Sequence, residues 1–281
     1  MPSPLPRALL LAAAVLAGCK SDRPPADAAA APPSPTVVTV TATDFKLDLP
    51  ATIPAGPVTI RLVNHGMEIH QAQLIRLDDG KTVADFEAAM KQNGRGTSWM
   101  KFAGGPTAAA PGQDATTTQL LTPGQYVAMC AIPSPDGVSH VMKGMVQPFE
   151  VAAGTAAAVL PAAGDTVRLL DYAFEQPRPL TAGHHTILVE NVGPQPHEIV
   201  LLKLPPGKSV ADFGTWATTG GMQGPPPAMP VGGLAVIDSG ASAVLAADLS
   251  PGDYGVICFM PDTKDGRPHF MHGMMTQIKV E

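Results

Sequence analysis

The chain repeats itself. Residues 36–152 and 165–281 carry the same short motifs in the same order, at an offset of 127 to 129 residues throughout. Scattered coincidences would not keep one spacing, so the pattern indicates a tandem duplication. The sequence therefore predicts two copies of one fold, each of ordinary domain size. The matched motifs include Asp44-Phe45 with Asp171-Tyr172, Asn64-His65-Gly66 with Asn191-Val192-Gly193, Val83-Ala84-Asp85-Phe86 with Val210-Ala211-Asp212-Phe213, and Pro123-Gly124 with Pro251-Gly252.

Both halves are expected to consist of β-strands. The 281 residues include 28 glycines and 31 prolines, which favours short strands joined by turns over long helices. The fold class is therefore predicted to be all-β, with two tandem β-sandwiches. Strands are predicted over 58–63, 71–77, 126–130, 149–151, 186–189, 198–204, 254–258 and 277–280. Short helices are predicted over 83–91 and 210–217, followed by long loops over 93–112 and 218–233.

The N-terminus has the pattern of an export signal. Arg7 supplies a positive charge, and residues 8–17 form an apolar run that is too short to span a bilayer. The following Leu16-Ala17-Gly18-Cys19 resembles the lipobox of bacterial lipoproteins. The resemblance implies that residues 1–18 are removed and that a lipid on Cys19 anchors the protein to the cell membrane or outer membrane, facing the periplasm or the exterior. An ordinary secretory signal is the alternative.

Composition also indicates the connecting segments and excludes one class of partner. Residues 19–35 are rich in Pro and Ala and are expected to form a disordered tether, and the small residues of 153–164 a linker. The net charge of −6 provides no basic surface for a nucleic acid.

Two further cysteines lie at equivalent places in the two halves. A disulfide between Cys130 and Cys258 would have to join two separate domains at equivalent points, which the required geometry disfavours. Unpaired thiols in an exported, oxidising compartment need protection by burial or by a ligand.

The same soft donors accompany each cysteine. A thiolate, imidazoles and a thioether form a set that favours copper over hard cations. The order is the same in both halves: first a histidine, then a cysteine, a second histidine and a methionine. The candidate ligands are His70, Cys130, His140 and Met145 in the first half and His197, Cys258, His269 and Met274 in the second, with Met142 and Met271 as alternative fourth donors.

This donor order resembles the type 1, or blue, copper site of the cupredoxins. The Asn-x-x-x-x-Pro-His sequence ending at His197 is similar to plastocyanin, and the His-x4-Met spacing is similar to copper nitrite reductases. The resemblance implies a Greek-key β-sandwich in each half, a trigonal copper site with a weak axial thioether, and one-electron transfer to a redox partner protein. The chain departs from the pattern in having nine or ten residues between the cysteine and the second histidine, and Ile69 instead of proline before His70.

Other interpretations of the same residues remain. Each cysteine can be a small buried hydrophobe, and the methionines can simply pack beneath the sandwich. The His/Met clusters over 140–145 and 269–275 can serve Cu(I) trafficking or scavenging. A metal-free cupredoxin-fold binding module is the third alternative. No enzyme and no catalytic residue are predicted, because copper nitrite reductases and laccases carry a His directly before the cysteine, or His-x-His pairs, where this chain has Met129 and Ile257.

Overall fold

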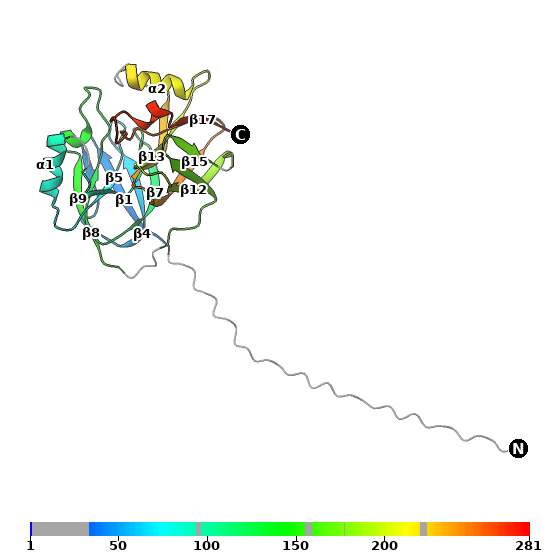
Figure 1. Ribbon diagram of the computed structural model, residues 1–281, viewed down its shortest axis with the longest axis horizontal. Helices are drawn as coiled ribbons and strands as arrows, with labels where there is room; N and C mark the ends of the chain where they lie inside the picture. The colour runs from blue at the N-terminus through cyan, green and yellow to red at the C-terminus, as the bar shows by residue number, and fades with distance from the viewer. Residues whose placement is uncertain (2–33, 94–96, 155–158, 177, 220–223) are drawn as a thin grey trace. The chain divides into compact units, whose positions relative to one another are not determined.

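The computed structural model describes Met1 and residues 34–93, 97–154, 159–176, 178–219 and 224–281. The predicted signal peptide, Cys19 and almost all of the tether lie outside the described residues, so these stay predictions. Strands dominate, which confirms the all-β class (Figure 1). None of the helices that the described residues form is long and apolar enough to cross a membrane.

Each repeat contributes one small sheet of its own. The sheet of the first repeat has the order β3-β9-β8-β5-β6, and that of the second has the order β14-β13-β16-β17. The strands of the first sheet are β3 (Thr52–Pro54), β5 (Gln73–Leu77), β6 (Met100–Phe102), β8 (Gly124–Met129) and β9 (Val146–Ala152). Those of the second are β13 (His197–Lys203), β14 (Met229–Ile237), β16 (Gly252–Ile257) and β17 (Met275–Val280).

A third sheet runs through both repeats, with the order β11-β10-β12-β15-β7-β4-β1-β2. It is continuous because β7 of the first repeat pairs with β15 of the second, in register from Thr116 opposite Ala246 to Gln119 opposite Ala243. Residues 33–281 accordingly form one compact unit. Its strands are β1 (Thr36–Thr43), β2 (Lys46–Asp48), β4 (Gly56–Asn64), β7 (Asp114–Leu121), β10 (Asp165–Leu170), β11 (Ala173–Glu175), β12 (Gly183–Asn191) and β15 (Ser242–Leu249).

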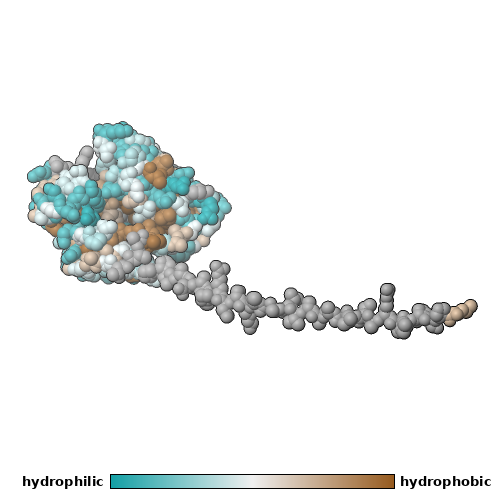
Figure 2. Space-filling model, turned by 60° about the horizontal axis from the view of Figure 1, so that its bottom comes forward, coloured by the Kyte–Doolittle hydropathy of each residue, from teal (hydrophilic) through white to brown (hydrophobic). Residues whose placement is uncertain are grey.

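Each small sheet packs on one half of the shared sheet and so makes one sandwich. The first core joins Ile60 of β4 to Leu74 of β5, and the second joins Val189 of β12 to Leu201 of β13. Residues on one face of a strand recur at every second position, so the buried pattern of β1 and β4 fits a sheet with a single core side. Hydrophilic residues cover much of the face seen in Figure 2, with hydrophobic patches between them.

Helices are few, and the long loops are more ordered than expected. Helix α1 (Val83–Asn93) and helix α2 (Val210–Thr219) lie where the sequence predicts them. The predicted loop 93–112 contains β6, and the predicted loop 218–233 contains the beginning of β14. β6 pairs with β5 and β14 pairs with β13, so pairing across an intervening helix orders segments in which glycine, proline and alanine hide the strand pattern.

Residues 103–107 lie between the two small sheets. They exchange backbone hydrogen bonds with β5 on one side, where Leu74 N–H donates to the Gly104 carbonyl at 2.8 Å. On the other side Gly104 N–H donates to the Val236 carbonyl at 3.0 Å. A segment predicted as loop therefore connects the two repeats.

Candidate metal centres

The predicted ligands of the first repeat meet at one end of its sandwich. His70 precedes β5, Cys130 directly follows β8, and His140 opens a short 3-10 helix, η1 (His140–Lys143). All three side chains are completely buried, and one ligand atom from each lies within 4.8 Å of the others.

The second repeat builds the same cluster. His197 begins β13, Cys258 directly follows β16, and His269 opens the 3-10 helix η2 (His269–His272). Their ligand atoms also lie within 4.8 Å of one another, and all three side chains are completely buried. Both cysteines are free thiols, as predicted.

The loop from cysteine to methionine is closed by backbone hydrogen bonds. Cys130 N–H donates to the Met145 carbonyl at 3.2 Å, and Met145 N–H donates to the His140 carbonyl at 2.9 Å. The equivalent bonds of the second repeat, at 3.2 and 3.0 Å, join Cys258 to Met274 and Met274 to His269. The backbone therefore holds cysteine, histidine and methionine in one fixed arrangement.

The additional residues between the cysteine and the second histidine form a short side loop in each repeat. A β-bridge closes this side loop, between Pro133 and Ser139 in the first repeat and between Pro261 and Pro268 in the second. Gly144 ends η1 with a φ of 95°, in the left-handed region that glycine adopts without strain, and the chain turns back there. The nine- and ten-residue spacings therefore still return each histidine to its cysteine.

The donor atoms of the first centre converge through the same ring nitrogen of each histidine. His70 Nδ1 lies 3.1 Å from His140 Nδ1, which lies 3.3 Å from Cys130 Sγ. The backbone N–H of Gln71 donates to the same sulfur at 3.4 Å. Two imidazoles and one thiol thus face a common point.

Carboxylates bind the far side of both rings. His70 Nε2 lies 2.7 Å from Asp44 Oδ1, and His140 Nε2 lies 2.9 Å from Glu68 Oε2. An Nε2–H donating to a carboxylate leaves the lone pair of Nδ1 directed at the centre, which is the usual arrangement of a metal-ligating histidine. Two such lone pairs at 3.1 Å repel each other unless a proton or a metal ion lies between them. The residues present therefore fit a metal ion.

The second centre has a different surrounding. His197 Nδ1 lies 2.9 Å from His269 Nδ1, Cys258 Sγ lies 3.6 Å from the latter, and Asp171 Oδ1 accepts from His197 Nε2 at 2.9 Å. His269 Nε2 is buried and has no hydrogen-bond partner among the described residues. The carboxylate oxygen Asp262 Oδ2 lies 3.9 Å from His269 Nε2, too far for a hydrogen bond.

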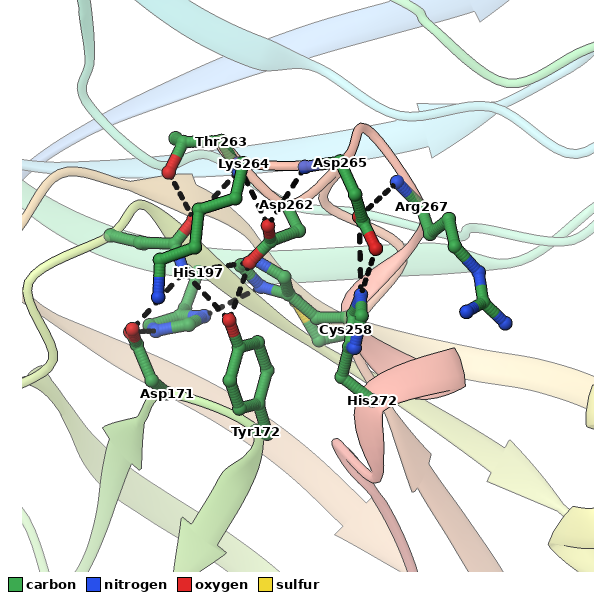
Figure 3. A network of polar contacts seen from close by, with 12 residues as sticks. Asp171, Tyr172, His197, Cys258, Asp262, Thr263, Lys264, Asp265, Arg267 and His272 are labelled. Carbon is green, nitrogen blue, oxygen red and sulfur yellow. Dashed lines mark hydrogen bonds and ion pairs between the residues drawn. The ribbon is translucent and has the colours of Figure 1, made fainter.

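Asp262 is occupied by other donors, as Figure 3 shows. Its Oδ2 accepts from Tyr172 Oη at 2.5 Å and from Gln195 Nε2 at 2.9 Å. Gln195 stands two residues before His197, where the first repeat has Glu68 before His70. In the first repeat the Glu68 carboxylate binds the second histidine, His140. In the second repeat the equivalent residue is Gln195, whose amide binds Asp262 instead of His269.

In the second repeat, a carboxylate instead follows the first histidine, His197, directly in the sequence. Glu198 is 6% exposed, and burial raises its pKa to about 7. Its Oε1 accepts from the backbone N–H of Phe259 at 3.0 Å. The equivalent residue of the first repeat is the uncharged Gln71.

Burial also identifies the fourth donor. Met145 and Met274 are completely buried and belong to the same core clusters as Cys130 and Cys258. The alternatives Met142 and Met271 are 49% and 38% exposed. The buried pair is therefore better placed for an axial thioether, since it shares the protected interior with the cysteines.

Burial sets the protonation of the metal-free centres. It raises the pKa of Cys130 to about 12 and that of Cys258 well above its ordinary value. It lowers the pKa of His70 and His197 despite their aspartate partners, and lowers that of His269 to about 4. At neutral pH the thiols are protonated and these imidazoles neutral, so a bound metal ion must displace a thiol proton.

One further group of potential ligands is present in the described part of the chain: Asp262, Asp265 and His272. Asp262 Oδ1 accepts from the backbone N–H groups of Lys264 and Asp265, and Asp265 Oδ1 lies 3.2 Å from His272 Nε2. Through these contacts the three side chains stabilise a turn.

The sequence interpretation missed the carboxylates around the rings. Asp44 and Asp171 were recognised only as a repeated motif, although an acidic residue that recurs with the ligands was a usable signal. Glu68 has no such signal, because its counterpart in the second repeat is Gln195.

The glycines of the Asn-x-Gly motif have a related role. A Cβ on Gly66 would lie 2.7 Å from His70 Nε2, and one on Gly193 would lie 2.8 Å from His197 Nε2. The aspartate–histidine pair therefore needs glycine at this point in both repeats.

No family model and no curated protein matches the sequence. Among solved structures, the chain is similar to a dithionite-reduced auracyanin from Roseiflexus castenholzii, with 20% identity, 43% of this chain and 99% of that chain covered, and a TM-score of 0.30. A multicopper oxidase matches at 15% identity over 87% of this chain and 88% of that chain, with a TM-score of 0.24. Copper nitrite reductase from Nitrosomonas europaea matches at 14% identity over 88% and 94%, with a TM-score of 0.26.

The three matches concern the fold alone. Their identities and TM-scores are too low to assign a metal or an activity to this chain. They include enzymes as well as an auracyanin, so they do not support the flat prediction that the chain is not an enzyme.

Proposed function

We propose that the chain is a cupredoxin-type protein that binds one copper ion at each of its two His-Cys-His centres and carries single electrons outside the cytoplasm. The observation that carries this proposal is the convergence, in both repeats, of two Nδ1 atoms and one Sγ in a completely buried cluster. A thiolate with two imidazoles and a weak thioether is the donor set of blue copper sites.

The residues of the chain suit electron transfer because they fix the positions of the donor atoms. The closed loop from Cys130 to Met145 and the carboxylates on the His70 and His140 rings keep the donors in place before any ion arrives. Bound copper would supply a Cu(I)/Cu(II) couple. Complete burial of the donors excludes water from the centre, and a fixed geometry reduces the rearrangement that accompanies electron transfer.

We also propose a location. The lipobox-like sequence ending at Cys19 supports attachment to the cell membrane or outer membrane through a lipid. The acidic net charge of −6 supports a partner that is a protein rather than a nucleic acid. A redox partner protein outside the cytoplasm is the partner that this role needs.

The first test is Cu(II) titration of the full chain, with visible absorption and bound-metal analysis. Wild type should bind about two copper ions and show an intense thiolate-to-copper band. Cys130→Ser and Cys258→Ser should each lose one ion and about half of the band, because a hydroxyl does not replace a thiolate on copper. Met274→Leu should change the band position, whereas the exposed control Met271→Leu should not.

Two other outcomes would replace this proposal. A colourless protein that retains Cu(I) and loses it on Met142→Leu or Met271→Leu would support copper trafficking, which the exposure of these two thioethers favours. A protein that retains no copper in either oxidation state would be a metal-free binding module.

A further inference from the structure

A cleft of about 910 Å³ lies between the two repeats. Its walls come from both: Ile69, Met129 and Ile132 from the first, and Val200, Phe259 and Met260 from the second. This volume falls in the range of about 300–1,000 Å³ that small-molecule sites occupy, and apolar walls with a few polar groups are their usual lining. The cleft exists only because the shared sheet and residues 103–107 hold the repeats together.

Strand alternation brings one polar residue from each repeat into this cleft. Successive side chains of a strand point to opposite faces of the sheet. His197 begins β13 and belongs to the buried cluster of its own repeat, so the next residue, Glu198, lies on the opposite face; Gln71 takes the equivalent place after His70, just before β5. Both line the cleft.

Glu198 has capacity for a ligand. One of its oxygens accepts from Phe259 N–H, and no cationic side chain lies within ion-pairing distance of it in the described part of the chain. A buried carboxylate without a cation is costly, because it loses hydration and gains no compensating charge. Gln71 keeps its carboxamide N–H groups unused among the described residues, since only its Oε1 is bonded, to Thr107 Oγ1 at 3.1 Å.

The other charged groups of the lining make the cleft acidic. Asp238 accepts from the backbone N–H of Phe102 at 3.1 Å and has no ion pair to a described residue. Lys101 is the only basic residue among those lining the cleft in the described ranges, and it pairs outside the cleft with Asp78 at 3.7 Å. The aromatic rings of Phe102 and Phe259 add surfaces that attract cations.

We propose that this cleft is a binding site for a small organic cation with an apolar body, whose ammonium group lies at Glu198. The apolar walls contact the body, and the charge at Glu198 selects the head group. The site goes beyond the proposed electron transfer and does not require copper.

The test compares three ligands with one body and different heads: 4-phenylbutylamine, 4-phenyl-1-butanol and 4-phenylbutyrate. Binding to the metal-free full chain is measured by isothermal titration calorimetry at pH 8 with a chelator present. The amine should bind at least about tenfold tighter than the alcohol, the size expected of one charge-assisted hydrogen bond in a shielded site, and the butyrate should bind weakest.

Two variants locate the site. Glu198→Gln keeps the shape and removes the charge, so the preference for amine over alcohol should disappear, whereas the exposed control Glu87→Gln should leave it unchanged. Ala131→Trp places a large ring at an exposed position on the cleft wall and should weaken all three ligands. Circular dichroism verifies that each variant is folded.

The proposal is wrong if the amine binds no better than the alcohol to wild type. It is equally wrong if folded Glu198→Gln keeps the full preference, or if Ala131→Trp binds all ligands as wild type does. If Glu198→Gln does not fold, Ala131→Trp decides the matter alone.

Discussion

At the scale of single residues, the two centres share their donors and differ in their neighbours. The first repeat has Glu68 two residues before its first histidine and Gln71 directly after it. The second repeat has Gln195 and Glu198 at these positions. The Glu68 carboxylate thus binds the His140 ring in the first centre, whereas the Glu198 carboxylate lies in the inter-repeat cleft beside the second centre.

The acid sensitivity of the metal-free protein follows from its buried imidazoles. The pKa of His269 is lowered to about 4, and those of His70 and His197 are also lowered, while in the unfolded chain all three titrate near the ordinary 6.5. As pH falls from about 6.5 towards 4, the unfolded chain takes up protons that the folded one does not, so stability decreases. Glu198, whose pKa burial raises to about 7, has the opposite effect in this range, so urea unfolding at pH 7 and pH 4.5 isolates the imidazole contribution only by comparison with a histidine variant.

A variant assigns the effect to the centre. His269→Gln should flatten the decrease in unfolding free energy between pH 7 and 4.5, whereas His184→Gln, at an exposed position, should leave it as in wild type. Equal slopes for wild type and His269→Gln would contradict this explanation.

At the scale of elements, residues 103–107 depend on glycine. Gly105 has a φ of 113°, and a Cβ there would collide with the backbone carbonyl oxygen of Ala72. Neither strain nor collision can be relieved by a side-chain rotation, because both involve the backbone that pairs with β5 and β14.

We expect Gly105→Ala to lower the free energy of unfolding by about 2 kcal/mol or more beyond Gly112→Ala. Gly112 is the matched control, since its φ of 75° is also left-handed but its Cβ would meet nothing within 4 Å. Denaturant unfolding monitored by circular dichroism measures both. Equal losses would show that the close approach to Ala72 is unimportant.

At the scale of the whole molecule, the repeats behave as one body because polar groups bind across their boundary. The buried Gln73 side chain forms the pair of hydrogen bonds with Val236 that the backbone of a neighbouring strand would form. Its Nε2 donates to the Val236 carbonyl at 3.0 Å, and its Oε1 accepts from Val236 N–H at 2.8 Å. Together with the pairing of β7 and β15, this links the small sheets as well as the shared one.

Gln73→Ala should therefore cost about 1–3 kcal/mol, because it leaves the N–H of Val236 buried and unpaired and removes one of the two donors to the Val236 carbonyl, which keeps the Gly104 N–H. It should also uncouple the repeats, so that one calorimetric transition broadens or splits into two. Gln125→Ala, on an exposed position of β8, should change stability by less than about 0.5 kcal/mol. A single sharp transition at the wild-type temperature for Gln73→Ala would contradict this coupling.

The local pattern was enough for the class of fold and for naming candidate donors. Period-two runs and turn residues depend on near neighbours, so the strands around Cys130 and Cys258, both helices and the eight candidate ligand positions could be predicted along the chain. The arrangement around these donors could not. Asp44, Glu68 and Glu198 act through atoms brought close by folding. The continuity of the shared sheet, the position of residues 103–107 between the two small sheets, and the cleft depend on contacts between the two repeats, which no local periodicity encodes.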